Sequence, residues 1–435
     1  MRTSVEFKPK NLSKFKKQLL LWALQFDEVV WLDSNNYQEA YSRFDAALAV
    51  DAFTGIKTDS YNAFEDLKDY QKATKDWIFG YLTYDLKNDL ERLTSNNFDG
   101  LEFPDLQFFQ PKRIVFFKGD TVVFEYLNMV SEDIEADFNS IEAMNSHSYY
   151  DNAQSNDIKI KMRIHKDAYF EKVNTMLAHI HRGDIYEANF CQEFYAEDTI
   201  INPLKTFNKL NNISQPPFAA FLKLNEFYLL CASPERYIQK QGSKVVSQPI
   251  KGTAKRSKNE EKDKALKFEL SQNEKERSEN IMIVDLVRND LSHTAKKGSV
   301  EVDELCKVYT FKQVHQMIST VTSLLDNDED YIETIKTTFP MGSMTGAPKL
   351  SAMQIIEALE ETKRGLYSGA VGYFTPENDF DFNVVIRSIL YNEVKKYVSF
   401  SVGSAITSKS NPLDEYEECL VKAKAMREAL KNHSN

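Results

Sequence analysis

Residues 276–287 read Glu276-Arg277-Ser278-Glu279-Asn280-Ile281-Met282-Ile283-Val284-Asp285-Leu286-Val287 and join two carboxylates to an apolar run. Glu276 and Glu279 stand three residues apart, so a helix places both on one face. The apolar run predicts that this helix is buried on at least one side, where facing carboxylates need a cation. The pattern predicts one helix from about residue 260 to 287 that belongs to the core.

Strand and helix patterns surround this segment without a strict alternation. Helices are predicted at 19–24, at 167–182 ending before Gly183, from 348 through 359, and at 413–430. Strands are predicted at 28–32, 113–117, 184–195, 369–374, 383–391 and 397–406. This order favours an α+β fold of layered β-sheets flanked by helices over a doubly wound sheet.

A polar, turn-rich tract between about residues 142 and 157 interrupts the apolar periodicity. It predicts two domains, an N-terminal α+β region at 1–155 and a second domain at 156–435.

Composition restricts the class of protein. The 435 residues have a net charge of −11, which argues against a nucleic-acid partner. The four cysteines show no metal or disulfide spacing, and no run approaches the roughly 18 to 20 apolar residues that cross a bilayer. The short apolar run at 19–24 lacks a small-residue cleavage site. We therefore expect a soluble cytoplasmic protein with no membrane partner.

A second carboxylate pair repeats the spacing of the first, at Glu415 and Glu418. Either pair alone is typical of a solvated helix face. Together with a buried helix they favour Mg²⁺, a hard cation that takes one or two carboxylates plus substrate oxygens.

Two further features suggest an anionic ligand. The loop Gly342-Ser343-Met344-Thr345-Gly346-Ala347-Pro348-Lys349 leads into a helix whose N–H groups could hold a carboxylate, although a tight loop capped by Thr345 is an equal alternative. Arg387 lies among apolar residues, so its guanidinium needs an anion, either a structural carboxylate or a substrate.

Three residues are candidates for acid–base or nucleophilic chemistry. Lys251 ends a predicted strand and could act as a nucleophile if it loses its proton, although a lysine before glycine is usually at the surface. Glu235 could be a base or a turn residue, and His315 could be a catalyst or a buried core residue.

Taken in chain order, these segments resemble the chorismate-utilising enzyme family, most closely its branch that forms 4-amino-4-deoxychorismate for para-aminobenzoate and folate. The segments are 183–189, Ser233-Pro234-Glu235-Arg236, Pro249-Ile250-Lys251-Gly252-Thr253, 283–290, 342–349 and 414–418. The resemblance is strong from about Lys166 to Met426 and weaker upstream, where 41–45 and 80–86 still match.

The resemblance implies a magnesium ion that holds chorismate's ring carboxylate and acts as a Lewis acid. Glu279 and Glu418 match its direct ligands, and Glu276 and Glu415 match residues that orient waters or ligands around them. Other positions match substrate contacts: Thr253, Thr345, Gly346, Ala347, Tyr367, Arg387, Gly403 and Lys422.

The resemblance also implies roles in the reaction. Lys251 matches a lysine that attacks C2 of chorismate as the C4 hydroxyl leaves, after which ammonia adds at C4 and expels the lysine. Glu235 matches the base, and His315 matches a histidine beside the leaving hydroxyl. Anthranilate synthases typically have alanine where this chain has Lys251, and enzymes that add water have a lysine where this chain has Glu187.

Some positions depart from the family pattern. Ala405 replaces a usual glycine, Lys409 a usual aspartate and Met341 a usual glycine. Glu187 stands where similar chains have glutamine, and its carboxylate either changes the pocket charge or pairs with a nearby cation.

The resemblance implies ammonia supplied by a separate glutamine amidotransferase subunit, since no cysteine has the nucleophile-elbow setting of a glutaminase. Leu32-Asp33-Ser34 lies where relatives bind tryptophan, although a strand-end turn explains Asp33 and Ser34 equally well. Two alternatives stay open: anthranilate synthase component I, and a catalytically silent relative that binds chorismate without turnover.

Overall fold

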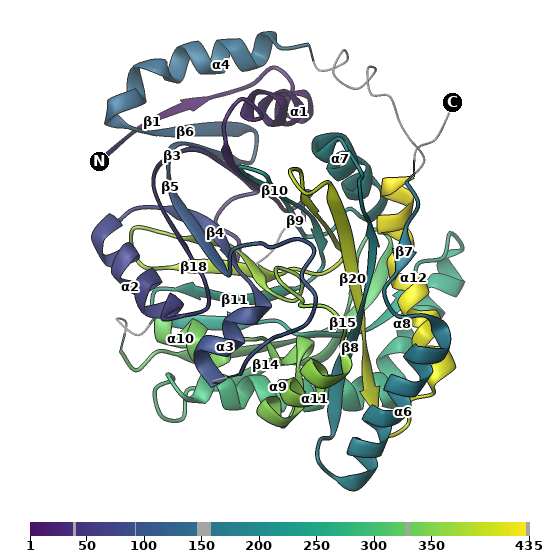
Figure 1. Cartoon of the computed structure of the whole chain (residues 1–435). Helices are drawn as coiled ribbons and strands as arrows, with labels where there is room; N and C mark the ends of the chain where they lie inside the picture. The colour runs from purple at the N-terminus through teal and green to yellow at the C-terminus, as the bar shows by residue number, and fades with distance from the viewer. Residues whose placement is uncertain (38–40, 92, 146–157, 328–330, 432–435) are drawn as a thin grey trace.

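The computed structural model describes residues 1–37, 41–91, 93–145, 158–327 and 331–431. Two antiparallel layers, joined through the long strands β3 (Ala46–Thr58) and β5 (Leu106–Lys118), form its centre. Figure 1 shows helices arranged around these strands.

The first layer runs outward from β3 to a strand that contributes to the site. β3 pairs with β2, β2 with β9, β9 with β10, β10 with β19, β19 with β20, and β20 with β8. The bounds of these strands are β2 Glu28–Asp33, β8 Glu187–Ala196, β9 Phe218–Leu224, β10 Phe227–Ser233, β19 Ser388–Asn392 and β20 Tyr397–Thr407. Shorter or flanking strands extend the layer: β1 Arg2–Phe7, β6 Thr121–Leu127, β7 Lys161–Met162 and β16 Gly346–Ala347.

The second layer runs from β5 through β4, β17, β18, β11 and β12 to β15, which also pairs with β13 and β14. Their bounds are β4 Ile78–Leu82, β11 Arg236–Gln241, β12 Lys244–Ser247, β13 Ile250–Lys255, β14 Glu301–Thr310, β15 Val314–Leu324, β17 Ala370–Phe374 and β18 Phe380–Val384.

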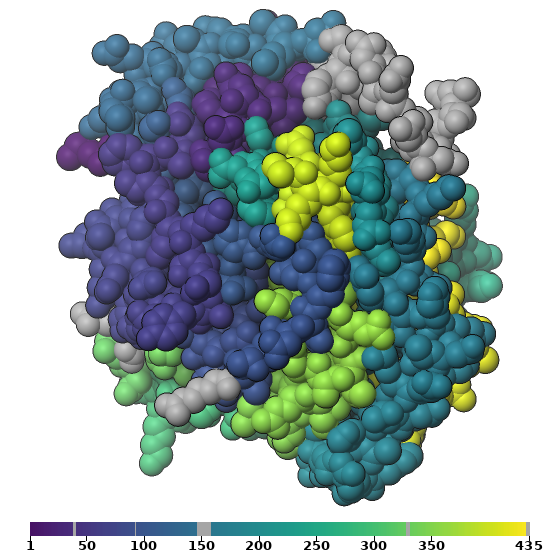
Figure 2. Space-filling view, viewed as in Figure 1, coloured from purple at the N-terminus to yellow at the C-terminus, as the bar shows by residue number. Residues whose placement is uncertain are grey.

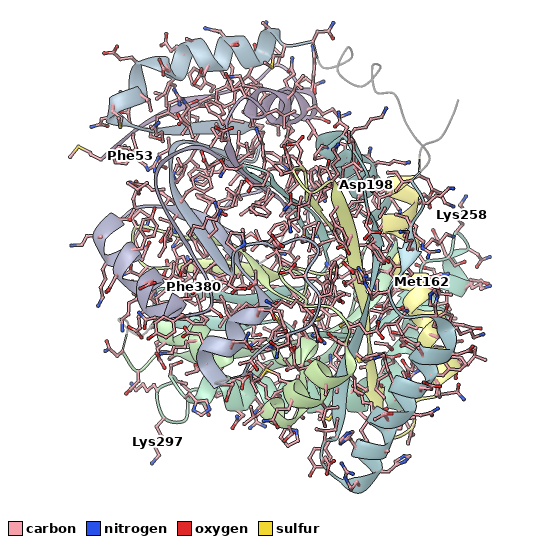
Figure 3. The ribbon with its side chains drawn as sticks, in the orientation of Figure 1. Phe53, Met162, Asp198, Lys258, Lys297 and Phe380 are labelled. Atoms are coloured by element: carbon pink, nitrogen blue, oxygen red, sulfur yellow. The ribbon has the colours of Figure 1, made fainter. Side chains whose placement is uncertain are left out.

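Alternating side chains of the strands build two large cores. One contains Ala47, Ala49, Leu222 and Phe382, so it takes residues from both layers. The other contains Leu48, Val50 and Phe221, which alternate with residues of the first core, together with residues of the helices that cover the first layer. Side chains fill the space among the elements, where Phe380 is buried and Lys297 extends outward (Figure 3).

Helices cover the outer faces of both layers. The helices of the first layer are α1 Leu12–Ala23, α4 Ile134–Ala143, α6 Lys166–Arg182, α7 Pro203–Ser214, α11 Lys349–Leu359 and α12 Pro412–Leu430. The others are α2 Ala63–Thr74, α3 Lys87–Glu91, α8 Glu260–Gln272, α9 Glu274–Ser292 and α10 Tyr331–Thr338, with short 3-10 turns η1 Tyr84–Leu86, η2 Asn128–Asp133 and η4 Gly342–Met344.

Two predicted elements are each divided in the structure. The helix expected across 260–287 is two helices, α8 and α9, because the Asn273 side chain caps the start of α9 by accepting from the Glu276 N–H at 3.1 Å. The strand expected across 383–391 is interrupted between Val384 and Ser388, where Arg387 has φ of +52°. The helix predicted at 19–24 and the strand predicted at 113–117 are the C-terminal parts of longer elements, α1 and β5. The other predicted helices and strands are confirmed within a few residues at their ends.

The predicted domain boundary at 155/156 lies outside the described residues. Strands from either side of it pair directly, β2 with β9 and β4 with β17. Figure 2 shows atoms of the first third of the chain packed against those of the last third on one face. Among the described residues, no helix is long and apolar enough to span a bilayer.

Candidate active site

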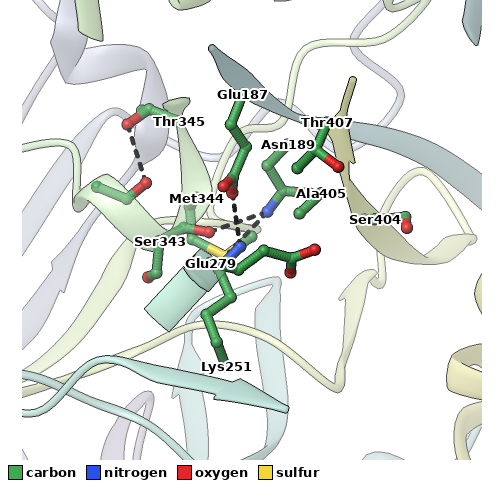
Figure 4. Close-up of polar contacts among 12 residues, drawn as sticks. Glu187, Asn189, Lys251, Glu279, Ser343, Met344, Thr345, Ser404, Ala405 and Thr407 are labelled. Carbon is green, nitrogen blue, oxygen red and sulfur yellow. Dashed lines mark hydrogen bonds and ion pairs between the residues drawn. The ribbon is translucent and has the colours of Figure 1, made fainter. Parts of the chain in front are cut away.

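The predicted nucleophile Lys251 lies at an irregularity of β13. The pairing of β13 with β15 shifts register between Ile250 and Thr253, and Gly252 takes the left-handed φ of +85° that this bulge requires. The Lys251 ammonium donates to Glu187 Oε1 at 2.7 Å, and the two side chains are 11% and 2% exposed. The bulge directs Lys251 toward β8 rather than into solvent (Figure 4).

The Lys251 ammonium is surrounded by acidic groups. Burial alone would lower the pKa of Lys251, but the carboxylates of Glu187, Glu279 and Glu235 raise it above its ordinary value. The lysine is therefore cationic in the free protein, so its attack on a substrate requires a proton acceptor.

The predicted base Glu235 follows β10 in the connection to β11. Burial raises the pKa of Glu235 to about 7, although hydrogen bonding to Ser343 and the positive charge of Lys251 both act to lower it. Glu235, Ser343, Pro249 and Asp290 are among the residues that line a pocket here. A carboxyl group that titrates near neutral pH can act as a base there.

The four motif glutamates come from two helices, Glu276 and Glu279 from α9 and Glu415 and Glu418 from α12. The Lys275 ammonium lies 3.9 Å from Glu279 Oε1 and 3.9 Å from Glu415 Oε1. Motif matching did not single out Lys275; its place directly before Glu276 and four residues before Glu279 is the only sequence signal for it.

The two glutamates of α12 have different hydrogen-bond partners. Ser404 donates to Glu415, and the Lys422 ammonium donates to Glu418 at 2.6 Å and to the Gly403 carbonyl at 2.8 Å. In the parts of the chain that the structure describes, no three His, Cys, Asp or Glu side chains are close enough to hold one metal ion.

The chemistry of this donor set nevertheless fits a hard cation. Glu279 Oε1 is buried and accepts no hydrogen bond within the described residues, and burial raises the pKa of Glu279 to about 7. Burial likewise raises the pKa of Glu276. Burial also acts to raise the pKa of Glu418, but the hydrogen bond from Lys422 and the combined positive charges of Lys422, Lys275 and Lys251 lower it below its ordinary value. A carboxylate oxygen that accepts no hydrogen bond is available to a hard cation such as Mg²⁺.

Arg387 and Tyr367, two of the predicted anion contacts, lie near each other in the fold. Arg387 occupies the bend between β18 and β19, and burial lowers the pKa of its guanidinium. Within the described chain this guanidinium has no hydrogen bond or ion pair. Tyr367 is 3% exposed, and its hydroxyl accepts from Cys191 Sγ at 3.8 Å.

The other predicted contacts differ in their exposure. Thr345 is fully buried and donates to the Met341 and Gly342 carbonyls, both at 3.3 Å, as a loop cap does. Gly346 and Ala347 form β16 and pair with the start of β8, whereas Thr253 is exposed on β13.

His315 is 1% exposed and lies opposite Ala254 in the pairing of β15 with β13. Its Nδ1 is 3.1 Å from Thr310 Oγ1 and its Nε2 is 3.1 Å from Asp263 Oδ1. No hydrogen bond or ion pair joins it to Lys251 or to the four glutamates among the described residues. Its catalytic role stays a prediction.

Arg364, a buried arginine outside the predicted motifs, forms hydrogen bonds with two segments of the site. Arg364 Nη2 donates to the Asn189 carbonyl at 2.7 Å, and Nη1 donates to the Met344 carbonyl at 2.6 Å. Arg364 also pairs with Glu360 at 2.7 Å, and Glu360 accepts from the Cys191 N–H at 2.9 Å. These bonds fix β8 against the 342–345 loop.

The structure also places the positions that depart from the family pattern. Ala405 lies opposite Asn189 in the pairing of β20 with β8. Lys409 is exposed before α12, and Met341 is 4% exposed. Glu187 pairs with Lys251, which is one of the two alternatives that the sequence left open for it.

A second pocket lies at the end of β2 and is lined by Leu32, Asp33, Ser34, Tyr373, Asp381 and Asn383 among others. Asp33 Oδ1 accepts from the Asn35 N–H at 2.9 Å, as in a turn, and pairs with Lys16 at 2.9 Å. Ser34 Oγ is buried and has no hydrogen bond in the described chain. Both the turn and a pocket are therefore present at this strand end.

The fold and this arrangement of lysine and carboxylates agree with one family. Residues 27–428 match the model of the chorismate binding enzyme family, and the chain belongs to that family.

Particular relatives lie in two branches of it. The chain is 41% identical to an aminodeoxychorismate synthase of Streptomyces griseus over 61% of its own length, but spans only 36% of that protein. It is 31% identical to aminodeoxychorismate synthase component 1 of Bacillus subtilis, over 87% of this chain and 80% of the relative. The crystal structure of anthranilate synthase component I from Streptococcus pneumoniae superposes with a TM-score of 0.78 at 25% identity, covering 90% of this chain and 93% of that one.

Proposed function

We propose that this chain is an aminodeoxychorismate synthase component I, which converts chorismate and ammonia to 4-amino-4-deoxychorismate for para-aminobenzoate and folate synthesis in the cytoplasm. The observation that carries the proposal is the buried Lys251 ammonium, which is directed into the site and lies near a glutamate whose pKa is about 7. Anthranilate synthases, the main alternative, typically have alanine at this place.

The residues of the chain supply binding and proton transfer. Arg387 has a guanidinium with no partner among the described residues, and it would bind a carboxylate of chorismate together with Tyr367. Lys251 would form the bond to C2 as the C4 hydroxyl leaves. Glu235 would take a proton from the incoming nitrogen at C4.

Magnesium would be held by Glu279 and Glu418, with Glu276 and Glu415 around them. When bound, it would draw electron density toward the ring carboxylate as a Lewis acid. The fit rests on the desolvated Glu279 oxygen, and Lys275 would have to leave the space between Glu279 and Glu415.

Ammonia would come from a glutamine amidotransferase subunit that docks on this chain. The pocket at the end of β2 supports a proposal that tryptophan binds there, since Ser34 Oγ is buried without a partner among the described residues. Calorimetric titration with tryptophan tests this, and absence of binding heat would contradict it.

The test of the function is to incubate the purified chain with chorismate, Mg²⁺ and excess ammonium salt, and to identify the product by chromatography and mass. A product that keeps the enolpyruvyl group and exchanges hydroxyl for amine is expected. Fluorescent anthranilate with release of pyruvate would select anthranilate synthase component I instead. Binding of chorismate without turnover, also in the presence of an amidotransferase subunit, would select the silent relative.

A further inference from the structure

Glu187 is the only residue in the described chain that forms a hydrogen bond or ion pair with the Lys251 ammonium, at 2.7 Å from its Oε1. Its other oxygen, Oε2, is buried and accepts no hydrogen bond within the described residues. This carboxylate therefore has one oxygen on the lysine and a second, desolvated oxygen that can take a proton.

The backbone fixes Glu187 in this position. Its strand β8 pairs on one side with β20, where Glu187 stands opposite Thr407, and on the other with β16, where it stands opposite Ala347. The preceding Tyr186 N–H donates to the Ala347 carbonyl at 2.7 Å. Because both neighbouring strands restrain β8 here, the carboxylate reaches Lys251 from a rigid element.

We propose that Glu187 is a further catalytic residue, which holds Lys251 for attack and accepts its proton as the lysine becomes a nucleophile. The inference rests on the proposed function, since it assigns the group that activates the proposed nucleophile.

The proton and bond changes balance as follows. One proton moves from the Lys251 ammonium to Glu187, and the free amine forms a bond to C2 while the C4–O bond breaks. The departing hydroxide takes a proton from the new C2–nitrogen centre and leaves as water. Ammonia then bonds to C4, the C2–nitrogen bond breaks, and Glu187 returns its proton to the lysine nitrogen. The cationic amine at C4 finally loses a proton, which restores the Lys251 ammonium through Glu235.

The other two carboxylates near Lys251 are less suited to this step. Glu279 feels the charge of Lys251 but forms no hydrogen bond with it, and its Oε1 lies 3.9 Å from the Lys275 ammonium. Glu235 is held by Ser343 and is needed for the incoming nitrogen. Glu187 alone is already bonded to the ammonium that must lose its proton.

The experiment isolates the first step by leaving out ammonia. The full chain, with Mg²⁺ and chorismate, is quenched at set times, and intact-protein mass spectrometry measures the fraction that has gained chorismate less water. Wild type, Glu187→Gln and Glu187→Asp are compared between pH 7 and 9. Glu193→Gln is the matched control, because Glu193 is a buried carboxylate of the same strand that pairs with Arg163.

Internal transfer to Glu187 makes the wild-type rate of adduct formation nearly independent of pH. In Glu187→Gln the proton must reach solvent first, so the rate should fall about 100-fold at neutral pH and rise about tenfold per pH unit. Glu187→Asp, which keeps the acceptor, should recover part of the rate and the flat profile. Glu193→Gln should keep the flat profile.

The two proposals fail in different ways. If wild type forms no adduct and Lys251→Ala makes product from ammonia at the wild-type rate, the nucleophile and the role of Glu187 are both wrong. If wild type forms the adduct and Glu187→Gln forms it with the same rate and pH profile, only the role of Glu187 is wrong. Should Glu187→Gln fail to fold, a Glu187→Asp rate equal to wild type but rising tenfold per pH unit would equally overturn it.

Discussion

Replacing Glu235 with glutamine should stabilise the protein above neutral pH while it removes activity. The folded structure raises the pKa of Glu235 from 4.5 to about 7. Since a tenfold change in proton affinity corresponds to about 1.4 kcal/mol, this difference corresponds to about 3 kcal/mol. The folded state binds the proton more tightly than the unfolded chain, so the free energy of unfolding falls as pH rises from about 4.5 to about 7.

Above about pH 7 the Glu235 carboxylate is ionised although it is buried, so the whole loss in the free energy of unfolding is present there. A glutamine at this position is neutral at every pH, so it adds no pH dependence to the free energy of unfolding. The free energy of unfolding of Glu235→Gln, relative to wild type, should therefore increase by about 3 kcal/mol between pH 4.5 and 7.5.

Urea unfolding of both proteins, followed by tryptophan fluorescence across this pH range, measures the difference. Taking wild type minus variant removes the titration of every group that the two share, Glu279 included. In parallel, the ammonia-dependent rate should fall by about 10² to 10⁴, the usual contribution of a general base. A difference in unfolding free energy that does not change with pH would refute the argument that burial raises the pKa of Glu235.

Three other substitutions test the remaining parts of the site. Arg387→Met should raise the KM for chorismate by about 10- to 100-fold without lowering the urea midpoint, because the guanidinium has no partner among the described residues; an unchanged KM would contradict its role as an anion contact. Arg364→Met should lower the free energy of unfolding by about 3 to 5 kcal/mol, because it leaves the buried Glu360 carboxylate unpaired. The double variant Arg364→Met with Glu360→Met should recover much of this loss. Gly403→Ala should lower both activity and stability, since a Cβ there would lie 2.3 Å from Asn189 Oδ1. Gly119→Ala, which has open space around it, is the control and should leave the activity unchanged. Equal activities of the two variants would show that β20 can move away from Asn189.

Much of the fold was predictable from local patterns. The periodicity that predicted α6 also predicted its end, where Gly183 has φ of +90°. The divided elements show the limit of this approach. Asn273 ends one helix and caps the next, and the apolar residues on either side of Arg387 hide a bend, because hydrophobic periodicity reports burial and not continuity of the backbone.

The residues of the candidate site were also mostly identified from the sequence, through motifs such as Pro249–Thr253 and the paired glutamates. Three partnerships were not: Glu187 with Lys251, Lys275 between Glu279 and Glu415, and Arg364 with the backbone of β8 and the 342–345 loop.

By itself the sequence determined the types of most elements, the family resemblance and the identities of most candidate residues, because these depend on neighbouring residues and on ordered motifs. Only the tertiary structure decided which charges meet. Glu187 and Lys251 are 64 positions apart, and they meet because β16 and β20 fix β8 while a bulge at Gly252 turns β13 toward it. A buried charge is stabilised by whichever opposite charge the strand pairing brings within hydrogen-bond distance, and local sequence does not specify that pairing.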